Sequence, residues 1–206
     1  MTTRIDVLLY DGFDELDAVG PFEVFENAAR AGADCEVSLV THETQERVTA
    51  SHGLDVGVDG TLANPGDDDA PDVLVVPGGG WSAGEGGVRR EYDSGELPEV
   101  IAAYHAAGTT IASVCTGAML LERAGILGTG PAITHQSAVE DLRDAGVTVP
   151  NARVVDTGQI VSAGGVTSGI DLALHLTERE FGKDVAESVA TTLEYEPRGT
   201  IRIARR

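Results

Sequence analysis

The alternation of short apolar runs with helical patterns constrains the fold of this chain more than any other feature. Val73–Pro77 is an almost fully apolar run, and similar runs lie at Ile5–Tyr10 and Thr109–Val114. Residues with helical spacing separate these runs. A strand with no polar face has to be covered on both sides. The order therefore predicts a doubly wound α/β fold, with a mostly parallel sheet between two layers of helices.

The expected elements follow one another without an internal repeat or a long linker, which predicts a single domain over residues 1–206. Further strands are expected at Cys35–Thr41, Ala132–Thr134 and Val154–Ser162, and a hairpin at Val48–Val58. Helices are expected at Leu16–Ala31, Leu97–Ala107, Thr116–Ala124, Ser168–Phe181 and Asp184–Leu193. Residues 64–71 and 81–87 are expected to be loops, and the glycines of the second loop would let it move over a site.

The charge balance bears on partners and surroundings more than on chemistry. The chain has 34 acidic and 14 basic residues, a net charge of −20, and Lys183 is its one lysine. Such a chain repels phosphates and anionic lipids, so neither a nucleic acid nor a membrane is an expected partner. No apolar run has membrane-spanning length and no signal-peptide pattern is present. We expect a cytoplasmic protein, and the scattered acids suggest a high-salt cytoplasm.

Three groups of residues follow predicted strands and are expected to meet at one edge of the sheet. They are Asp11–Asp17, Gly78–Gly80 and Cys115. In open α/β sheets, ligands bind beyond the carboxyl ends of the strands. The order of the sequence therefore predicts a site that combines acidic side chains, a glycine turn and a cysteine.

Cys115 lies in the stretch Ser113-Val-Cys-Thr-Gly117, which has the form of a nucleophile elbow. A strand that turns sharply into a helix needs small residues two positions before and two after the nucleophile. The start of the helix would also favour a thiolate at this position. A small buried hydrophobe is the alternative, and the pattern alone leaves both open. Cys35 lies at the start of a strand without such a turn and is interpreted as a core residue.

The glycines and acids around the predicted site each allow two interpretations. The amides of Gly78 and Gly79 could join that of Thr116 in an oxyanion hole, or the glycines could only form a tight turn. Asp17 could exchange protons with the cysteine, or it could favour the start of a helix, as could its acidic neighbours.

His135 follows the cysteine by 20 residues and is expected to have a supporting role, because no glutaminase-like His-x-Glu sequence follows. The remaining histidines, at positions 42, 52, 105 and 175, have no clustered partners. No two histidines have the spacing of metal ligands, so no metal site is expected.

The chain resembles the ThiJ/PfpI superfamily of glutamine amidotransferase-like proteins with a flavodoxin-like fold, and within it the isonitrile hydratase group. The resemblance extends over nearly the whole sequence. It is carried by Leu16-Asp-Ala-Val-Gly-Pro-Phe-Glu-Val24, Val76-Pro-Gly-Gly79, Ser113-Val-Cys-Thr-Gly117, Thr134-His135, the run from Ala163 to Leu174, and Leu193-Glu-Tyr-Glu-Pro197. The hydratase-like Thr-His-Trp is replaced by Thr-His-Gln136, which bears on substrate identity.

The resemblance implies a set of roles. Cys115 would attack the terminal carbon of a small isonitrile to give a thioimidate, and Asp17 would be the acid/base. Thr116 would place its amide and hydroxyl near the intermediate, and Gly79 with Gly78 would supply backbone donors. Water would then release an N-substituted formamide. The resemblance also implies a homodimer and no cofactor.

Two other functions remain open at the level of the sequence. One is a hydrolase or a glyoxalase/deglycase-like activity of the same superfamily. The other is a redox sensor without catalysis, because an activated thiolate is readily oxidised.

Overall fold

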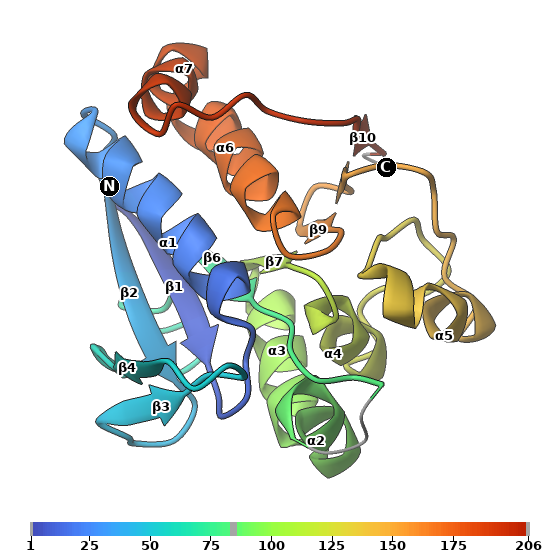
Figure 1. Ribbon diagram of the computed structural model, residues 1–206. Coiled ribbons are helices and arrows are strands. Elements are labelled where there is room, and N and C mark those ends of the chain that lie inside the picture. Colours follow the sequence, from blue (N-terminus) through green and yellow to red (C-terminus); the bar gives the residue numbers. More distant parts are fainter. Residues whose placement is uncertain (1, 83–85, 205–206) are drawn as a thin grey trace.

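The computed structural model describes residues 2–82 and 86–204, and its centre is an eight-stranded sheet (Figure 1). Every pair of neighbouring strands is parallel except β8 with β9, which confirms the mostly parallel flavodoxin-like sheet. The order across the sheet is β10 (Ile201–Ile203), β8 (Val154–Asp156), β9 (Ile160–Ala163), β7 (Thr110–Ser113), β6 (Val73–Val76), β1 (Thr3–Leu9), β2 (Cys35–Thr41) and β5 (Gly60–Thr61).

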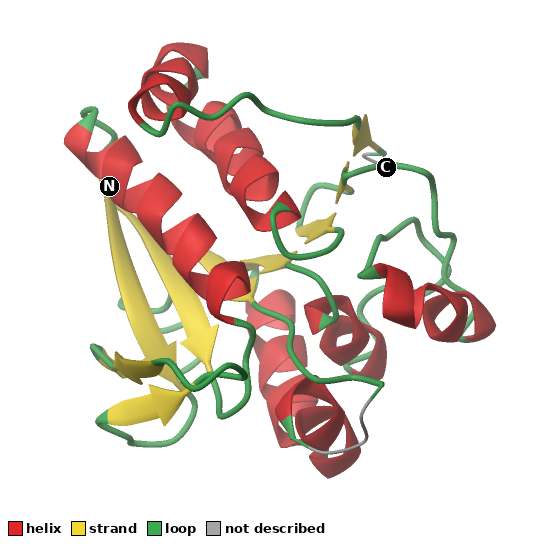
Figure 2. Cartoon of the chain, in the orientation of Figure 1, coloured by secondary structure: helices red, strands yellow, loops and turns green. Residues whose placement is uncertain are grey.

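Helices cover both faces of the sheet (Figures 1 and 2). On one face, α1 (Glu15–Arg30), α6 (Ser168–Phe181) and α7 (Lys183–Thr192) pack against one another. On the other face lie α2 (Gly87–Ser94), α3 (Glu96–Ala107) and α4 (Gly117–Arg123). A short helix, α5 (Val139–Asp144), follows a 3₁₀ turn (Gln136–Ala138). The chain forms a single domain with one hydrophobic core.

The central strands are buried on both sides, as their composition requires. All four residues of β6 are buried, and Val73 pairs with Ile5 of β1 on one side and Thr110 of β7 on the other. Burying a large aliphatic side chain stabilises a fold by roughly 1.5–3 kcal/mol, so three such adjacent strands fix the sheet order strongly. This fixed centre determines where the turns at the strand ends lie.

Two predicted strands differ from the structure. Ala132–Thr134 forms no strand: the Ile133 amide donates to Ser162 Oγ at 3.0 Å, and Thr134 Oγ1 donates to the Cys115 carbonyl at 2.9 Å. Side chains and loop carbonyls therefore bond to the polar groups of this buried segment, in place of the backbone of a neighbouring strand. Val154–Ser162 is two antiparallel strands, β8 and β9, because Gly158, with a φ of 103°, turns the chain between them.

The predicted hairpin is confirmed as β3 (Arg47–Thr49) with β4 (Asp55–Gly57). The sequence analysis did not predict α2, α5, β5 or β10. The expected loop at 81–87 lies partly outside the described residues, and its last residue, Gly87, begins α2. Across the described residues, no helix combines the length and the apolar character needed to cross a bilayer.

Candidate active site

Cys115 lies at a strained turn between β7 and α4. Its φ is 58°, in the left-handed region that residues other than glycine rarely adopt. The Cys115 amide holds this conformation by donating to the carbonyls of Gly164, at 2.9 Å, and Ala163, at 3.2 Å. Two residues later, a Cβ on Gly117 would lie 2.4 Å from the Val76 carbonyl oxygen. The structure therefore has the geometry of a nucleophile elbow, including its need for a small residue.

Gly78, directly after β6, marks the point where the acid and the cysteine meet. A Cβ on Gly78 would lie 2.7 Å from Asp17 Oδ2, 2.7 Å from the Thr116 amide nitrogen and 2.8 Å from Cys115 Cβ. The Gly78 amide donates to Asp17 Oδ2 at 2.9 Å. Two segments that are far apart in the sequence, one with Asp17 and one with Cys115 and Thr116, thus surround one backbone position. The absence of a side chain at Gly78 is what allows them to approach one another.

Asp17 lies in the first turn of α1 and is fully buried. Burial, reinforced by the nearby charge of Asp14, raises its pKa to about 8. The Gly78 amide and the Cys115 thiol act in the opposite direction but are outweighed. Among the described residues, no protein group forms a hydrogen bond with Oδ1. At neutral pH Asp17 is therefore mostly a neutral acid, with a proton to give.

The Cys115 thiol is also held neutral. Burial, and then the negative charge of Asp17, raise its pKa to about 12. The backbone amides of Val166 and Thr116 act in the opposite direction and lower the pKa, but burial outweighs them. The expected effect of the helix start on the thiolate is thus outweighed by burial. Removing the thiol proton requires a nearby group to accept it.

The hydrogen bonds assign the predicted oxyanion donors differently from the sequence analysis. The Gly78 amide is engaged by Asp17, and the Gly79 amide donates to Thr116 Oγ1 at 3.0 Å. The Thr116 hydroxyl in turn donates to the Gly79 carbonyl at 2.7 Å. Gly78 and Gly79 therefore hold Asp17 and Thr116 in place. The amides of Thr116 and Val166, by contrast, act on the Cys115 thiol and lower its pKa.

Val166 was not among the predicted site residues. It lies in the loop between β9 and α6 and has a φ of 31°, which is exceptional for a β-branched residue. A sequence signal precedes it, since the pair Gly164-Gly165 is typical of a turn or loop. The direction of a single amide, however, depends on the tertiary structure.

His135 lies beside this loop, and its side chain bonds to Ser137. Its Nδ1 is 2.8 Å from Ser137 Oγ and accepts from the Ser137 amide at 3.2 Å. A Cβ on Gly165 would lie 2.5 Å from its ring carbon Cδ2. The preceding residue, Thr134, bonds to the Cys115 carbonyl. The placement is compatible with a supporting role through the backbone.

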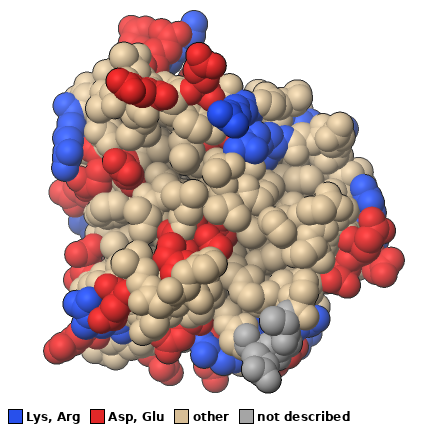
Figure 3. Space-filling model, viewed as in Figure 1, with Lys and Arg blue, Asp and Glu red and all other residues tan. Residues whose placement is uncertain are grey.

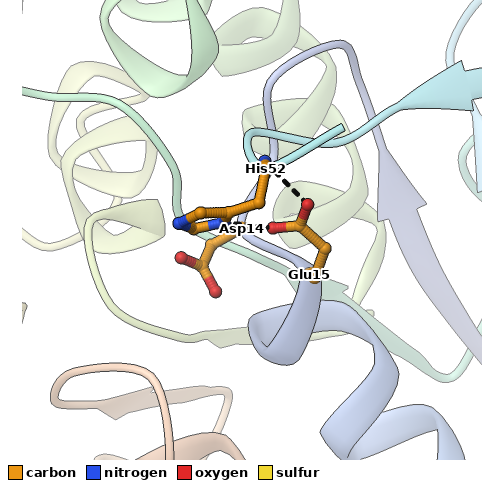
Figure 4. A group of neighbouring side chains, drawn as sticks. All are labelled: Asp14, Glu15 and His52. Atoms are coloured by element: carbon orange, nitrogen blue, oxygen red, sulfur yellow. Dashed lines mark hydrogen bonds and ion pairs between the residues drawn. The ribbon is translucent and has the colours of Figure 1, made fainter. Parts of the chain in front are cut away.

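A second polar cluster joins Asp14 and Glu15, at the start of α1, to His52 in the β3–β4 turn (Figure 4). The expectation that His52 has no clustered partners is therefore wrong, because the hairpin folds back onto α1. Each residue offers one possible metal-ligand atom, and these atoms lie within 4.8 Å of one another. Glu15 is already occupied: its oxygens accept from the amides of His52 and Leu54, at 2.7 and 3.4 Å, and from Ser51 Oγ at 3.1 Å. His52 Nδ1 also lies 2.6 Å from Glu15. The cluster therefore fastens the turn of the β3–β4 hairpin to α1.

The fold and the site at Cys115 define a flavodoxin-like α/β protein with a cysteine elbow and a buried acid, Asp17, beside it. The chain belongs to the DJ-1/PfpI family, whose sequence profile matches residues 3–179.

The relatives fall into several functional groups. An isonitrile hydratase of Pseudomonas putida is 33% identical over 199 residues, which is 96% of this chain and 80% of that protein. A deglycase of Pyrococcus abyssi is 28% identical over 160 residues, covering 78% of this chain and 89% of that protein. The crystal structure of a ThiJ/PfpI family protein from Pseudomonas syringae superposes with a TM-score of 0.82 at 28% identity, covering 96% of this chain and 77% of that one. The family thus includes enzymes with different reactions.

Proposed function

We propose that this protein hydrates small isonitriles to N-substituted formamides through a covalent bond to Cys115. One observation carries the proposal: the carboxylate of the buried Asp17 and the side chain of Cys115 meet at Gly78. Burial raises the pKa of Asp17 to about 8, which suits an acid/base. The 33% identity with an isonitrile hydratase supports the choice of reaction.

The first half of the reaction forms the thioimidate. As the sulfur of Cys115 bonds to the terminal carbon of R–N≡C, Asp17 gives its proton to that carbon and takes the thiol proton. The product is Cys115–S–CH=N–R, and Asp17 is neutral again. An acid with a pKa of about 8 suits this exchange, because both of its protonation states are accessible near neutral pH. The amides of Thr116 and Val166 stabilise negative charge on the sulfur during the transfer.

The second half releases the product. The oxygen of a water molecule bonds to the thioimidate carbon, and a proton reaches the nitrogen with Asp17 as the relay. The C–S bond then breaks, the hydroxyl proton returns to the sulfur by way of Asp17, and R–NH–CHO leaves. A covalent route divides one difficult hydration into two easier additions.

The test is the conversion of a simple isonitrile, such as cyclohexyl isonitrile, followed by NMR through the formyl proton of the product. Wild-type protein should produce the formamide, and Cys115→Ala should abolish its formation. Cys35→Ala is the matched control, because Cys35 is a buried thiol beside the Phe25 carbonyl. The assay is repeated from low to high salt. No turnover at any salt concentration at which the protein is folded would exclude the proposal.

A deglycase-like reaction on small aldehyde adducts is the second candidate, supported by the similarity to the Pyrococcus abyssi protein. Incubation with methylglyoxal-modified amino acids separates the two, because only a deglycase would release the free amine. A redox sensor has less support. Cys115 is only 6% exposed and its thiol has a raised pKa, both of which slow oxidation by peroxide.

We also propose that the protein is a cytoplasmic homodimer suited to high salt. On the face in Figure 3, charged side chains lie mainly around the edge, with acidic residues prominent. Leu16 and Leu54, which are 38% and 48% exposed, are among the large apolar side chains open to solvent. Sedimentation at several salt concentrations tests the proposal, and a monomer at every micromolar concentration would contradict it.

A further inference from the structure

The loop between β9 and α6, residues 164–167, adjoins Cys115: the Gly164 carbonyl accepts from the Cys115 amide at 2.9 Å, and the Val166 amide acts to lower the pKa of the thiol. Val166 has a φ of 31°, and a β-branched residue keeps such a conformation only where its surroundings enforce it. On one side of the loop lies a surface cavity of about 380 Å³, which Gly164, Gly165 and Ser168 help to line. Packing on that side is therefore incomplete, and other contacts must hold the loop.

Arg153, just before β8, contacts both ends of this loop. Its carbonyl oxygen accepts from the Gly164 amide at 3.0 Å, and Gly164 in turn accepts from the Cys115 amide. Its side chain reaches the other end, where Nη2 donates to Thr167 Oγ1 at 2.9 Å. Val166 lies between these two contacts. A single arginine thus holds the loop on either side of Val166.

The guanidinium group of Arg153 is itself held in place by Asp171 on α6. Arg153 Nε donates to Asp171 Oδ2, and Asp171 is buried. The same carboxylate accepts from the Tyr195 hydroxyl at 2.9 Å and from the Arg198 amide at 2.8 Å. The planar guanidinium of Arg153 can donate to the Asp171 carboxylate and to the Thr167 hydroxyl at the same time. A lysine ammonium is a point charge on a flexible stem and lacks this fixed geometry.

We propose that Arg153 is a positioning residue for the cysteine: anchored by Asp171, it holds Thr167 and thereby directs the Val166 amide at the Cys115 sulfur. The inference rests on the proposed role of Cys115 as nucleophile, but it does not depend on the identity of the substrate.

The experiment measures the rate at which iodoacetamide alkylates Cys115 as a function of pH, by mass spectrometry of the peptide that contains it. Arg153→Lys keeps the charge opposite Asp171 but loses the simultaneous contact with Thr167. The alkylation rate at neutral pH should fall roughly three- to tenfold, and the midpoint of the pH profile should rise, because the thiolate loses one well-directed donor. Thr167→Val should produce the same change, and Thr167→Ser should restore the wild-type profile.

Arg179→Lys is the matched control. Arg179 also faces a buried aspartate, Asp156, with Nη1 at 3.5 Å, and donates to a backbone carbonyl, that of Gly158, at 2.8 Å. Its other hydrogen bonds, to Glu180 and Thr110, also lead away from the loop at residues 164–167. This variant should match Arg153→Lys in thermal stability and match the wild type in its alkylation profile.

Three outcomes would count against the inference. A wild-type profile for both Arg153→Lys and Thr167→Val would overturn it. An equal shift in Arg179→Lys would also overturn it, because the effect would then be a general loss of stability. A wild-type Cys115 that is not alkylated at any pH would overturn both the inference and the nucleophile role. A wild type that is alkylated but converts no isonitrile would overturn the proposed reaction and leave this inference standing.

Discussion

Glu15 and Asp17 are two acids in the first turn of the same helix, and the structure gives them opposite surroundings. Asp17 is fully buried, accepts the Gly78 amide and has an oxygen without a protein partner among the described residues. Glu15 is half-buried and accepts hydrogen bonds from the hairpin turn at residues 51–54. Two positions along a helix correspond to about 200° around its axis, so the two side chains point to different sides.

The pKa values follow these surroundings. Burial raises the pKa of Asp17 to about 8. Burial also acts to raise the pKa of Glu15, but hydrogen bonds from His52, Ser51 and the backbone outweigh it and lower the pKa to about 2. The comparison teaches that a carboxyl group becomes a proton donor where it is buried with too few hydrogen-bond donors to stabilise its carboxylate form. It becomes a structural anchor where donors surround it.

The largest expected effect is on catalysis by Asp17→Asn. The amide has the shape of the carboxylic acid and can still accept from Gly78, but it cannot exchange a proton with Cys115. Formamide production should fall about 10²- to 10⁴-fold, the usual contribution of a positioned acid/base. Steady-state rates with a simple isonitrile measure the change.

Glu15→Gln is the matched control for that substitution, because it makes the same chemical change two residues away. It should keep the rate within about twofold. If both variants lost activity equally, Glu15 would have to belong to the reacting group, and the distinction between the two acids would fail.

The next effect comes from filling the position between the acid and the cysteine. In Gly78→Ala the new methyl group would lie 2.7 Å from Asp17 Oδ2 and from the Thr116 amide nitrogen. Forcing these groups apart should lower the rate at least tenfold and destabilise the fold by about 1–3 kcal/mol, as overpacking does. Gly57→Ala has nothing within 4 Å of its new methyl group and serves as the control. Unchanged activity in Gly78→Ala would mean that Asp17 and Cys115 need not meet there.

Parts of this site were predictable from the sequence, and the reason differs from residue to residue. The strands before Gly78 and Cys115 were predicted almost to the residue because continuous apolar runs have to be buried. The elbow followed from the small residues around Cys115. Asp17 could be separated from its acidic neighbours only by resemblance, because helix capping and proton transfer favour the same residue types at the same spacing.

Other parts depend on tertiary contacts that no local pattern contains. Val166 contributes its amide, which has no side-chain signature, and its direction depends on the contacts of Arg153 with both ends of the loop. The segment Ala132–Thr134 was wrongly predicted as a strand because a buried apolar run can also be a loop whose polar groups bond to side chains. Glu15 and His52 meet only because the hairpin folds back onto α1.

The two acids should make stability depend on pH in opposite directions. The pKa of Asp17 in the folded protein, about 8, lies above the 3.8 of an ordinary aspartate. Between these values the unfolded chain loses the proton while the folded chain keeps it. The contribution of Asp17 to stability is therefore largest below about pH 3.8 and is lost as the pH rises towards 8. In denaturant titrations, the free energy of unfolding of Asp17→Asn should rise relative to that of the wild type as the pH increases over this range, by about a few kcal/mol in total. A constant difference would show that Asp17 is ionised in the folded protein.

The smallest expected effect is on the stability of the Glu15 anchor. The pKa of Glu15 is lowered to about 2 from an ordinary 4.5, so its contribution is present above about pH 4.5 and is lost as the pH falls through 2. At neutral pH, Glu15→Gln should lower the free energy of unfolding by about 1 kcal/mol, since solvent screens part of the interaction. Glu26→Gln is the control, because Glu26 is paired only loosely with Arg30, at 3.9 Å on the surface, and should change little. The difference between Glu15→Gln and the wild type should close as the pH approaches 2. If that difference instead grew in acid, Glu15 would be a buried, protonated group like Asp17, and the two acids would no longer represent two different kinds of environment.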